Sequence, residues 1–600
     1  MKKNSSKIIV LIVSIVLSIS AIDSFGQCQQ LDTLGIDNLQ DSLSTHFPSI
    51  CKKVTIGTSV TDYDIVALKI SDNVNIDEPE PEILLTFCIH GDEDNPEQVA
   101  MKLARELCLK YNDDPQITNL INTREIWIIA VVNPDGFRGI GSIFLHTRIN
   151  ANGVDLNRNF GYMWNPEFGY DDNPAPYSEA ESKVMRDFLL SRNFSVVIDY
   201  HSGLQGIIYP WYYKTDNCPD FPEISYLANQ YDTESGYPEG EFAVTSGADL
   251  YVTNGALVEF AYGSLGIHAF AVELMEFNSP TWNSCELMTI NKPSILMMIQ
   301  KAGEGIGGKV TDANTGLPIQ AKIELEGRVP SYNGKEHGDY HHFLLAGDYT
   351  ITASASGYNS QAMNVSVSNG ELTIQDFVLS PADNFGAQKL LTSRNYNNTS
   401  DPAETWKALG LNDNQKYAIG DTGYVVLDMG AAINDIAGND ITVHGSASAE
   451  GNGYEVFHSG SIDGPWNSLG TGNTTESFDI SGATNARYFR IEDNGAGPGG
   501  VLGAGFNLDA LTASDISTGV GVISYAESVN IYPNPTNGIV NIDVEGYDKI
   551  TEIRVLSING ELLLKDNFTN SLNLYFLPSG IYFIQLFTNS TVLTHKIIKQ

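Results

Sequence analysis

The chain has 600 residues, which is too long for one hydrophobic core, so we expect three or more domains. It contains 34 basic and 73 acidic residues, and its formal net charge is −39. Phosphate contacts need clustered lysine and arginine, so this balance argues against a nucleic-acid-binding protein. It suits a soluble extracellular protein.

The first residues have the pattern of a cleaved export signal. Three lysines precede an apolar stretch at residues 8–22, and Ser24, Phe25 and Gly26 follow it as the expected cleavage region. The apolar stretch is shorter than the roughly 20 residues that a membrane span needs. A signal peptide at residues 1–26 is therefore preferred over a membrane anchor, and we expect the mature protein to be secreted or held at the cell surface.

All six cysteines follow this signal and lie in the first half of the chain: Cys28, Cys51, Cys88, Cys108, Cys218 and Cys285. Exported proteins can form disulfides, but the spacing of these cysteines leaves their pairing open. Because the sequence has no CxxC motif, a thiolate metal cluster is not expected.

Residues 27–302 alternate strand-like and helix-like segments. Apolar runs predict strands at 83–89, 125–132, 195–199 and 268–273, and helical patterns occur at 95–111 and 178–191. Nearly continuous apolar strands separated by helices indicate a sheet that is buried on both faces. We therefore expect an α/β catalytic domain in which helices cover both faces of a mixed sheet.

After residue 302 the pattern changes to short alternating strands punctuated by glycine, which is typical of β-sandwiches. We expect three such domains, at residues 303–381, 383–513 and 527–600, with a linker at 514–526. No repeat of the solenoid kind is evident in the sequence.

Polar side chains stand where the predicted strands of the α/β domain end. His90 and Glu93 follow the first strand, His201 follows the third, and Glu273 ends the fourth. Ligands of open α/β sheets bind outside the carboxyl ends of the strands, so we expect these side chains to meet at one edge. Two imidazoles and a carboxylate are the ligand set of a catalytic zinc site, and a further carboxylate can act as general base. A hydrogen-bonded structural histidine is the alternative for each position alone, but their joint placement favours a metal site.

Five motifs in consistent order and spacing resemble the zinc metallocarboxypeptidases of the carboxypeptidase A type, peptidase family M14. They are HGDE at 90–93, NPDG at 133–136, NGVDLNRNF at 152–160, DYHS at 199–202 and AVEL at 271–274. The resemblance covers about residues 30–300 and implies one catalytic Zn²⁺. It assigns the roles of metal ligands to His90, Glu93 and His201. It also implies that Asp155 orients a ligating histidine, that Glu273 is the general base and that Arg148 stabilises the oxyanion.

The same resemblance implies a substrate site. Asn157 and Arg158 are expected to bind the free C-terminal carboxylate of a peptide, and Tyr251 is expected to cap the substrate. Val258 matches the floor of the side-chain pocket, where relatives that prefer basic residues carry an acid at this position or nearby. An apolar floor favours apolar or aromatic C-terminal residues. The neighbouring Glu259 either affects this pocket or is a structural acid.

The three β-domains have weaker resemblances of their own. Residues 303–381 resemble the transthyretin-like domain of regulatory carboxypeptidases and are expected to pack against the enzyme. Residues 383–513 resemble a galactose-binding β-sandwich with a carbohydrate or cell-surface ligand, and Asp440 and Asp509 are candidate Ca²⁺ ligands there. Residues 527–600, with YPNP and a basic end, resemble a type IX secretion sorting domain, which implies outer-membrane secretion machinery as a partner.

These patterns together predict a secreted zinc metallocarboxypeptidase that hydrolyses the C-terminal residue of peptides. Two alternatives remain. A zinc amidohydrolase of the same fold would act on cell-wall peptides or acyl-amino acids, although Asn157, Arg158 and Tyr251 argue against it. A non-enzymatic surface adhesin would carry an inert peptidase fold, although the complete set of ligands and base argues against that.

Overall fold

The computed structural model describes residues 30–599 except 94, 140–145, 166–174, 277–282, 384, 395–403, 421, 448–452, 484, 496–504, 517–528, 533–535, 545–551, 558–561, 568–570 and 588–591. The signal peptide expected at 1–26 lies outside the described residues. The chain divides into two compact units, Met1–Ile516 and Ser517–Gln600, and the division falls inside the linker expected at 514–526.

An eight-stranded mixed sheet in the order β1-β2-β4-β3-β5-β8-β6-β7 forms the α/β domain. Its strands are β1 (Cys51–Thr58), β2 (Asp64–Ile70), β3 (Glu82–Phe87), β4 (Glu125–Ile129), β5 (Phe194–Gly203), β6 (Gln205–Tyr209), β7 (Ala243–Ser246) and β8 (His268–Glu276). The central strands β4, β3, β5 and β8 pair in parallel, whereas β1 with β2, β2 with β4 and β6 with β8 are antiparallel. The mixed sheet predicted from the sequence is confirmed.

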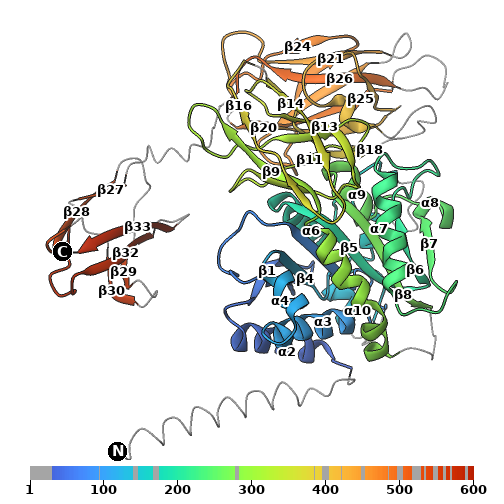
Figure 1. Ribbon diagram of the computed structural model, residues 1–600. Coiled ribbons are helices and arrows are strands. Elements are labelled where there is room, and N and C mark those ends of the chain that lie inside the picture. Colours follow the sequence, from blue (N-terminus) through green and yellow to red (C-terminus); the bar gives the residue numbers. More distant parts are fainter. Residues whose placement is uncertain are drawn as a thin grey trace, which may run out of the picture. The chain divides into compact units, whose positions relative to one another are not determined.

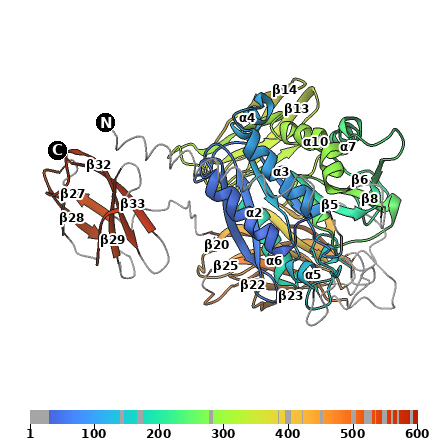
Figure 2. The ribbon, with the colours of Figure 1, turned by 90° about the horizontal axis from the view of Figure 1, so that it is seen from below.

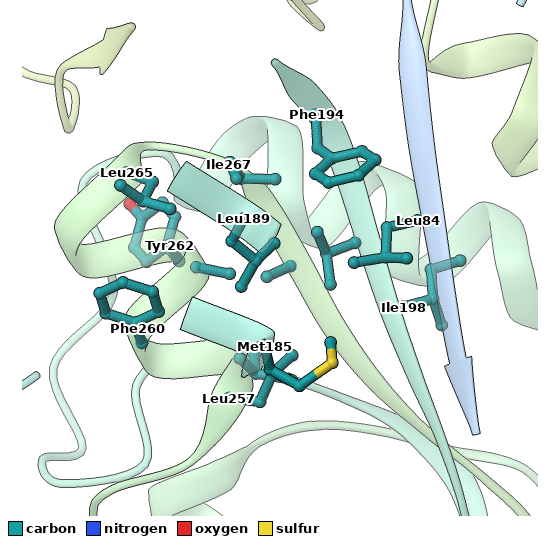
Figure 3. Close-up of a cluster of buried hydrophobic side chains, with 14 of the residues drawn as sticks. Leu84, Met185, Leu189, Phe194, Ile198, Leu257, Phe260, Tyr262, Leu265 and Ile267 are labelled. Atoms are coloured by element: carbon teal, nitrogen blue, oxygen red, sulfur yellow. The ribbon is translucent and has the colours of Figure 1, made fainter. Parts of the chain in front are cut away.

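Helices cover both faces of this sheet. They are α2 (Thr33–His46), α3 (Pro96–Lys110), α4 (Pro115–Ile121), α5 (Pro134–Arg138), the 3₁₀ turn η1 (Leu156–Arg158), α6 (Ala180–Ser191), α7 (Phe221–Glu234), α8 (Gly247–Leu250), α9 (Leu257–Leu265) and α10 (Ser284–Lys301). On one face α10 contacts α3 and α7, and α2 lies beside α3 (Figures 1 and 2). On the other face Met185 and Leu189 of α6 gather with Leu257 and Phe260 of α9 over β5 (Figure 3).

Local sequence explains where several helices begin. Pro96, whose missing N–H costs nothing at a first turn, starts α3 directly after the loop that carries His90 and Glu93. Asn283 starts α10 with a capping box, because its side chain accepts the N–H of Glu286 and the Glu286 carboxylate accepts the N–H of Asn283. The helix therefore begins at a fixed residue.

Three further pairs of sheets follow. The first pair contains β9 (Gly305–Asp312), β10 (Lys322–Leu325), β11 (Ser331–Tyr332), β12 (Asp339–His342), β13 (Gly347–Ser354), β14 (Gln361–Val367), β15 (Leu372–Ile374) and β16 (Phe377–Leu379). It forms the sheets β11-β10-β13-β14 and β12-β9-β15, with β16 beside β9. The pairing is antiparallel except that β15 and β16 run parallel to β9. This sandwich has a hydrophobic core of its own.

The second pair contains β17 (Phe385–Gly386), β18 (Lys389–Arg394), the 3₁₀ turn η3 (Thr405–Ala408), β19 (Tyr417–Ala418), β20 (Tyr424–Ile433), β21 (Ile441–Ala447), β22 (Tyr454–Ser459), β23 (Asn467–Gly472), β24 (Glu476–Phe478), β25 (Ala486–Asp493) and β26 (Phe506–Ala513). Its sheets are β17-β26-β21-β24, with β19 beside β26, and β18-β20-β25-β22-β23. Unlike the first sandwich, it shares one hydrophobic core with the α/β domain.

Backbone and ion-pair contacts fix this second sandwich to the α/β domain. The backbone N–H of Trp164 donates to the Ser393 carbonyl (2.9 Å), and the backbone N–H of Ser393 donates to the Gly161 carbonyl (2.7 Å). The buried Arg186 of α6 holds the carboxylate of Asp463 through two hydrogen bonds of 2.8 and 3.0 Å. The sequence did not predict this attachment.

The second unit contains β27 (Val529–Tyr532), β28 (Ile539–Val544), β29 (Glu552–Ser557), β30 (Leu562–Asn567), β31 (Ser571–Asn573), β32 (Gly580–Phe587) and β33 (Val592–Lys599). They form the sheets β27-β28-β31 and β30-β29-β32-β33 around a core that includes Val540, Val555 and Ile584. The expected α/β domain followed by β-sheet domains is therefore observed.

Among the described helices, none has the length and apolarity to cross a membrane. The thiols of Cys51, Cys108 and Cys218 are buried and unbridged, whereas Cys285 is disulfide-bonded. Of the six cysteines whose pairing the sequence left open, Cys51, Cys108 and Cys218 therefore form no disulfide.

Candidate active site

Three ligand side chains converge at the carboxyl edge of the central strands. His90 and Glu93 follow β3, and His201 stands near the end of β5. The Nδ1 atom of His90 lies 2.6 Å from Glu93 Oε1 and 3.2 Å from His201 Nδ1, and His201 Nδ1 lies 3.0 Å from Glu93 Oε2. All three side chains are buried and surround one point. The expected convergence is therefore present.

Sheet pairing brings these residues together from distant parts of the chain. Strands β3 and β5 are parallel neighbours, so both open toward the same edge. The apolar residues of β3 are fully buried, and the strand ends at Phe87, just before the ligand loop. The backbone N–H of Ser202 also donates to Glu93 Oε2 (3.1 Å), which links the β5 end to the β3 loop.

Each histidine turns Nδ1 toward the shared point and Nε2 toward an acid. His90 Nε2 lies 3.2 Å from Asp155 Oδ1, as the orienting role expected for Asp155 requires. His201 Nε2 lies 2.9 Å from Asp199 Oδ2, and the hydroxyl of Thr86 donates to Asp199 Oδ1 (2.7 Å). Such partners fix the tautomer and orientation of ligating imidazoles.

Asp199 is a site residue that the sequence analysis did not select. A signal for it exists, because residues two apart on a strand project to the same face and Asp199 precedes His201 by two. In the motif DYHS, the sequence predicts a role in the site only for the histidine.

The charged groups of the cluster interact strongly with one another. Burial alone would lower the pKa of His201, but Asp199 and Glu93 raise it well above its usual value. Burial would likewise raise the pKa of Glu93, but His90 and His201 hold it well below its usual range. Three buried acids (Glu93, Asp155 and Asp199) surround the two imidazoles. Two nitrogens and a carboxylate around one point are a donor set that zinc accepts, so the residues fit the ion.

Arg148 borders this cluster on its solvent side. Its Nε and terminal nitrogen donate to Asp155 Oδ2 at 2.9 Å, and a terminal nitrogen lies 3.5 Å from Glu93 Oε1. The backbone carbonyl of Arg148 accepts from the side chain of Asn133 in the NPDG motif (3.3 Å). The Arg148 side chain is 38% exposed and so remains accessible.

Asn157 and Arg158 extend the site away from the metal ligands. The backbone N–H of Asn157 donates to Asp155 Oδ1 (2.9 Å), and its Nδ2 lies 3.4 Å from His201 Nε2. The Asn157 side-chain carbonyl accepts the N–H of Leu257 at the start of α9 (3.0 Å). Arg158 donates to the hydroxyl of Tyr251 (3.2 Å), whose side chain is half exposed. The residues expected to hold the substrate are therefore contiguous with the ligand cluster.

Glu273 lies beside His201 on the adjacent strand β8. Burial raises its pKa to about 7, and its Oε2 atom has no hydrogen-bond partner among the described residues. A carboxylate with a pKa near neutrality is suited to accepting and returning a proton.

The expected pocket residues lie on α9. Val258 is buried. Glu259 Oε1 accepts the backbone N–H groups of Tyr212 (2.8 Å) and Tyr213 (3.0 Å). Burial raises the pKa of Glu259 to about 8. These contacts match the structural alternative that the sequence left open for Glu259.

The candidate calcium ligands satisfy backbone groups instead. Asp440 accepts the N–H of Ile436 with one carboxylate oxygen and that of Ile480 with the other, at 2.8 and 2.9 Å. Asp509 accepts the N–H of Asp413 (3.1 Å). The expectation of calcium has no support in these contacts.

A mixed α/β sheet that carries a histidine–glutamate–histidine cluster, the partly buried Glu273 carboxylate and an arginine at its carboxyl edge has the parts of a zinc peptidase site. Residues 36–286 match the zinc carboxypeptidase family, and residues 530–600 match the secretion system C-terminal sorting domain. The α/β domain is therefore similar to the M14 zinc carboxypeptidases over residues 36–286, and residues 530–600 form a sorting domain of the kind that directs secretion at the outer membrane.

One animal and one plant carboxypeptidase are among the relatives of this chain. The carboxypeptidase N catalytic chain of Rattus norvegicus is 28% identical over 376 residues, which cover 55% of this chain and 82% of the relative. Carboxypeptidase SOL1 of Arabidopsis thaliana is 28% identical over 379 residues, covering 60% of this chain and 74% of the relative. Among solved structures, carboxypeptidase A from Helicoverpa armigera aligns with a TM-score of 0.38 and 20% identity over 45% of this chain and 71% of that one.

Proposed function

We propose that this zinc carboxypeptidase removes single C-terminal residues from peptides and prefers apolar or aromatic ones. The observation that carries the proposal is the continuity of Asn157, Arg158 and Tyr251 with the metal-ligand cluster. An enzyme that binds a free carboxylate beside its reactive centre acts on chain ends, because an internal peptide bond offers no such group.

The chemistry follows from the positions of the charged groups. When bound by His90, Glu93 and His201, zinc supplies polarisation of the scissile carbonyl and acidification of a water molecule. Glu273 accepts the proton of that water and returns it to the leaving amine. Arg148 stabilises the negative charge that develops on the carbonyl oxygen.

Asn157 and Arg158 hold the substrate's terminal carboxylate. The planar guanidinium of Arg158 suits a carboxylate, since both can form two parallel hydrogen bonds. Tyr251 covers the bound residue, with its hydroxyl already hydrogen-bonded to Arg158. The Leu257 N–H holds the Asn157 side chain in place, so part of the carboxylate site is formed before substrate arrives.

The preference for apolar residues rests on Val258 and on the occupation of Glu259. Val258 offers no charge at the pocket floor. The Glu259 carboxylate, which stands next to it, is engaged with the backbone of Tyr212 and Tyr213. A basic substrate side chain would then lose its hydration without gaining an ionic partner.

The domain assignments beyond the catalytic domain extend the proposal. The match to the rat relative covers a larger share of this chain than residues 36–286 alone, which supports a shared domain at 303–381 of the transthyretin-like kind. For residues 383–513 we propose a galactose-binding-like sandwich that recognises carbohydrate or cell-surface ligands. This sandwich shares a hydrophobic core with the α/β domain, so the proposed recognition would lie on the same compact unit as the enzyme.

One experiment separates the three functional hypotheses. The protein is incubated with N-blocked dipeptides that end in Phe or Arg, each with a free or an amidated C-terminus, with and without a zinc chelator. Cleavage of the free acids only, faster for Phe and lost on chelation, is the expected result. Equal cleavage of the amides favours the zinc amidohydrolase, and no cleavage of any substrate favours the adhesin.

A further inference from the structure

A second cluster of metal-binding side chains lies at the junction of the α/β domain and the first β-sandwich. Asp220 is the residue before α7, His268 begins β8, and His342 ends β12 of the sandwich. Their exposed fractions are 0%, 0% and 2%. The cluster is separate from the catalytic site, because none of its residues belongs to the ligand set of His90, Glu93 and His201.

The facing atoms of this cluster are close but not hydrogen-bonded. The Nε2 atoms of His342 and His268 lie 3.7 and 4.0 Å from Asp220 Oδ1, beyond the range of a hydrogen bond. The two imidazole rings are 4.6 Å apart between centroids. Both ring nitrogens of His268, Nε2 of His342 and Oδ1 of Asp220 have no hydrogen-bond partner in the described part of the chain. Buried polar atoms are seldom left without a partner, so these atoms can serve together as ligands of one shared group.

Asp220 is oriented as a metal ligand would be. Its other oxygen, Oδ2, accepts the hydroxyl of Tyr262 (2.6 Å) and the N–H of Val329 (3.1 Å). The Tyr262 oxygen in turn accepts the N–H of Asp220 (3.0 Å). These contacts fix the carboxylate and leave Oδ1 directed at the two histidines, which is how supporting hydrogen bonds present a ligand.

The charges around the cluster are compatible with a dication. The nearest cation is Arg328, whose Nε lies 3.8 Å from Asp220 Oδ1. Its terminal nitrogens are engaged by Glu223 (3.1 Å) and by the Pro219 carbonyl (3.1 Å), so two buried acids, Glu223 and Asp220, share this one guanidinium charge.

We propose that Asp220, His268 and His342 bind a second, structural zinc ion that fastens the first β-sandwich to the α/β domain. Ligand atoms of a tetrahedral zinc site stand about 3.3 Å apart, so the cluster contracts by a few tenths of an ångström when the ion enters. Water is the expected fourth ligand. Because two ligands come from the α/β domain and one from the sandwich, the ion stabilises the junction and takes no part in peptide hydrolysis.

Metal content tests the proposal directly. The purified mature protein is loaded with ZnSO₄, dialysed against zinc-free buffer and measured by inductively coupled plasma mass spectrometry. We expect about two zinc ions per chain in the wild type and about one in both His268→Gln and His342→Gln. The matched control is His341→Gln, because residue 341 also lies on β12 but projects to its opposite face. This control retains the wild-type zinc content.

A second measurement covers the case in which these variants fold poorly. His90→Gln removes one catalytic ligand, so zinc that remains in this variant belongs to the junction. We expect His90→Gln to hold about one zinc ion per chain, and we expect a chelator to lower the melting temperature of this variant. The proposal is overturned if the wild type holds only one zinc ion. It is also overturned if His90→Gln holds no zinc and its melting temperature does not respond to the chelator. Water would then bridge the three side chains.

Discussion

Glu273 and His201 are direct partners across the parallel strands β5 and β8. Partners in a sheet project to the same face, so the register alone places the Glu273 carboxylate beside a metal ligand. These two residues, 72 positions apart in the sequence, are thus brought together by strand pairing alone. His201 and Glu273 both stand on strands, which hold side chains more rigidly than loops do.

The first prediction concerns the general base. Glu273→Gln keeps the size of the side chain and its strand position but cannot accept a proton. We expect zinc content to remain unchanged while kcat falls by about 10²- to 10⁴-fold. Glu276→Gln, an exposed position on the same strand, is the control and retains activity. Wild-type turnover in Glu273→Gln would contradict the assigned role.

The second prediction concerns the carboxylate clamp. Hydrogen bonds to charged groups contribute about 1.5–3 kcal/mol, so Arg158→Ala is expected to lower kcat/KM for a free-acid dipeptide by roughly 10- to 100-fold. The amidated dipeptide, which has no terminal charge, is affected less. Arg158→Lys keeps the charge but not the planar fork, and it recovers only part of the loss. Equal losses for the acid and the amide would indicate that Arg158 acts on structure rather than on the substrate.

The third prediction concerns the orienting acid that the sequence analysis did not select. Asp199→Asn replaces the acceptor of His201 Nε2 by a neutral amide while keeping its shape. We expect zinc affinity to fall about 10- to 100-fold, as for other partners of ligating histidines. Competition with a calibrated chelator measures this, and exposed Asp113→Asn is the control. An unchanged affinity would show that His201 needs no such partner.

The sequence predicted the catalytic centre because each part left a local signal. His90 and Glu93 interrupt an apolar run, and His201 and Glu273 stand at the ends of strands that their composition makes recognisable. The rule that ligands bind at the carboxyl ends of parallel strands then joins these signals. The approximate domain division after residue 302 was likewise visible as a change in strand pattern.

Contacts between domains left no such signal. Trp164 pairs with Ser393, and Arg186 holds Asp463, yet nothing near either residue marks its partner. The cluster of Asp220, His268 and His342 joins three separate elements, and each of its residues is unremarkable alone. The candidate calcium acids failed for a related reason, because Asp440 in a turn serves the backbone as often as an ion.

The fourth prediction separates the two roles that remained open for Glu259. A glutamate usually has a pKa of 4.5, and burial raises that of Glu259 to about 8. The unfolded chain therefore releases this proton above about pH 4.5, whereas the folded chain retains it until about pH 8. Within this window the folded state binds more protons, so its stability is greatest at the acidic end and falls as the pH rises.

Glu259→Gln removes this titration and retains a carbonyl oxygen that accepts the N–H groups of Tyr212 and Tyr213. We expect the decrease in melting temperature between pH 5 and pH 8 to be smaller in the variant than in the wild type, as measured by circular dichroism. Exposed Glu239→Gln, the control, shows the full decrease. If Glu259 instead served the pocket, the variant would lose activity on dipeptides ending in Arg relative to those ending in Phe. A structural acid leaves that ratio unchanged, because it makes no contact with the substrate.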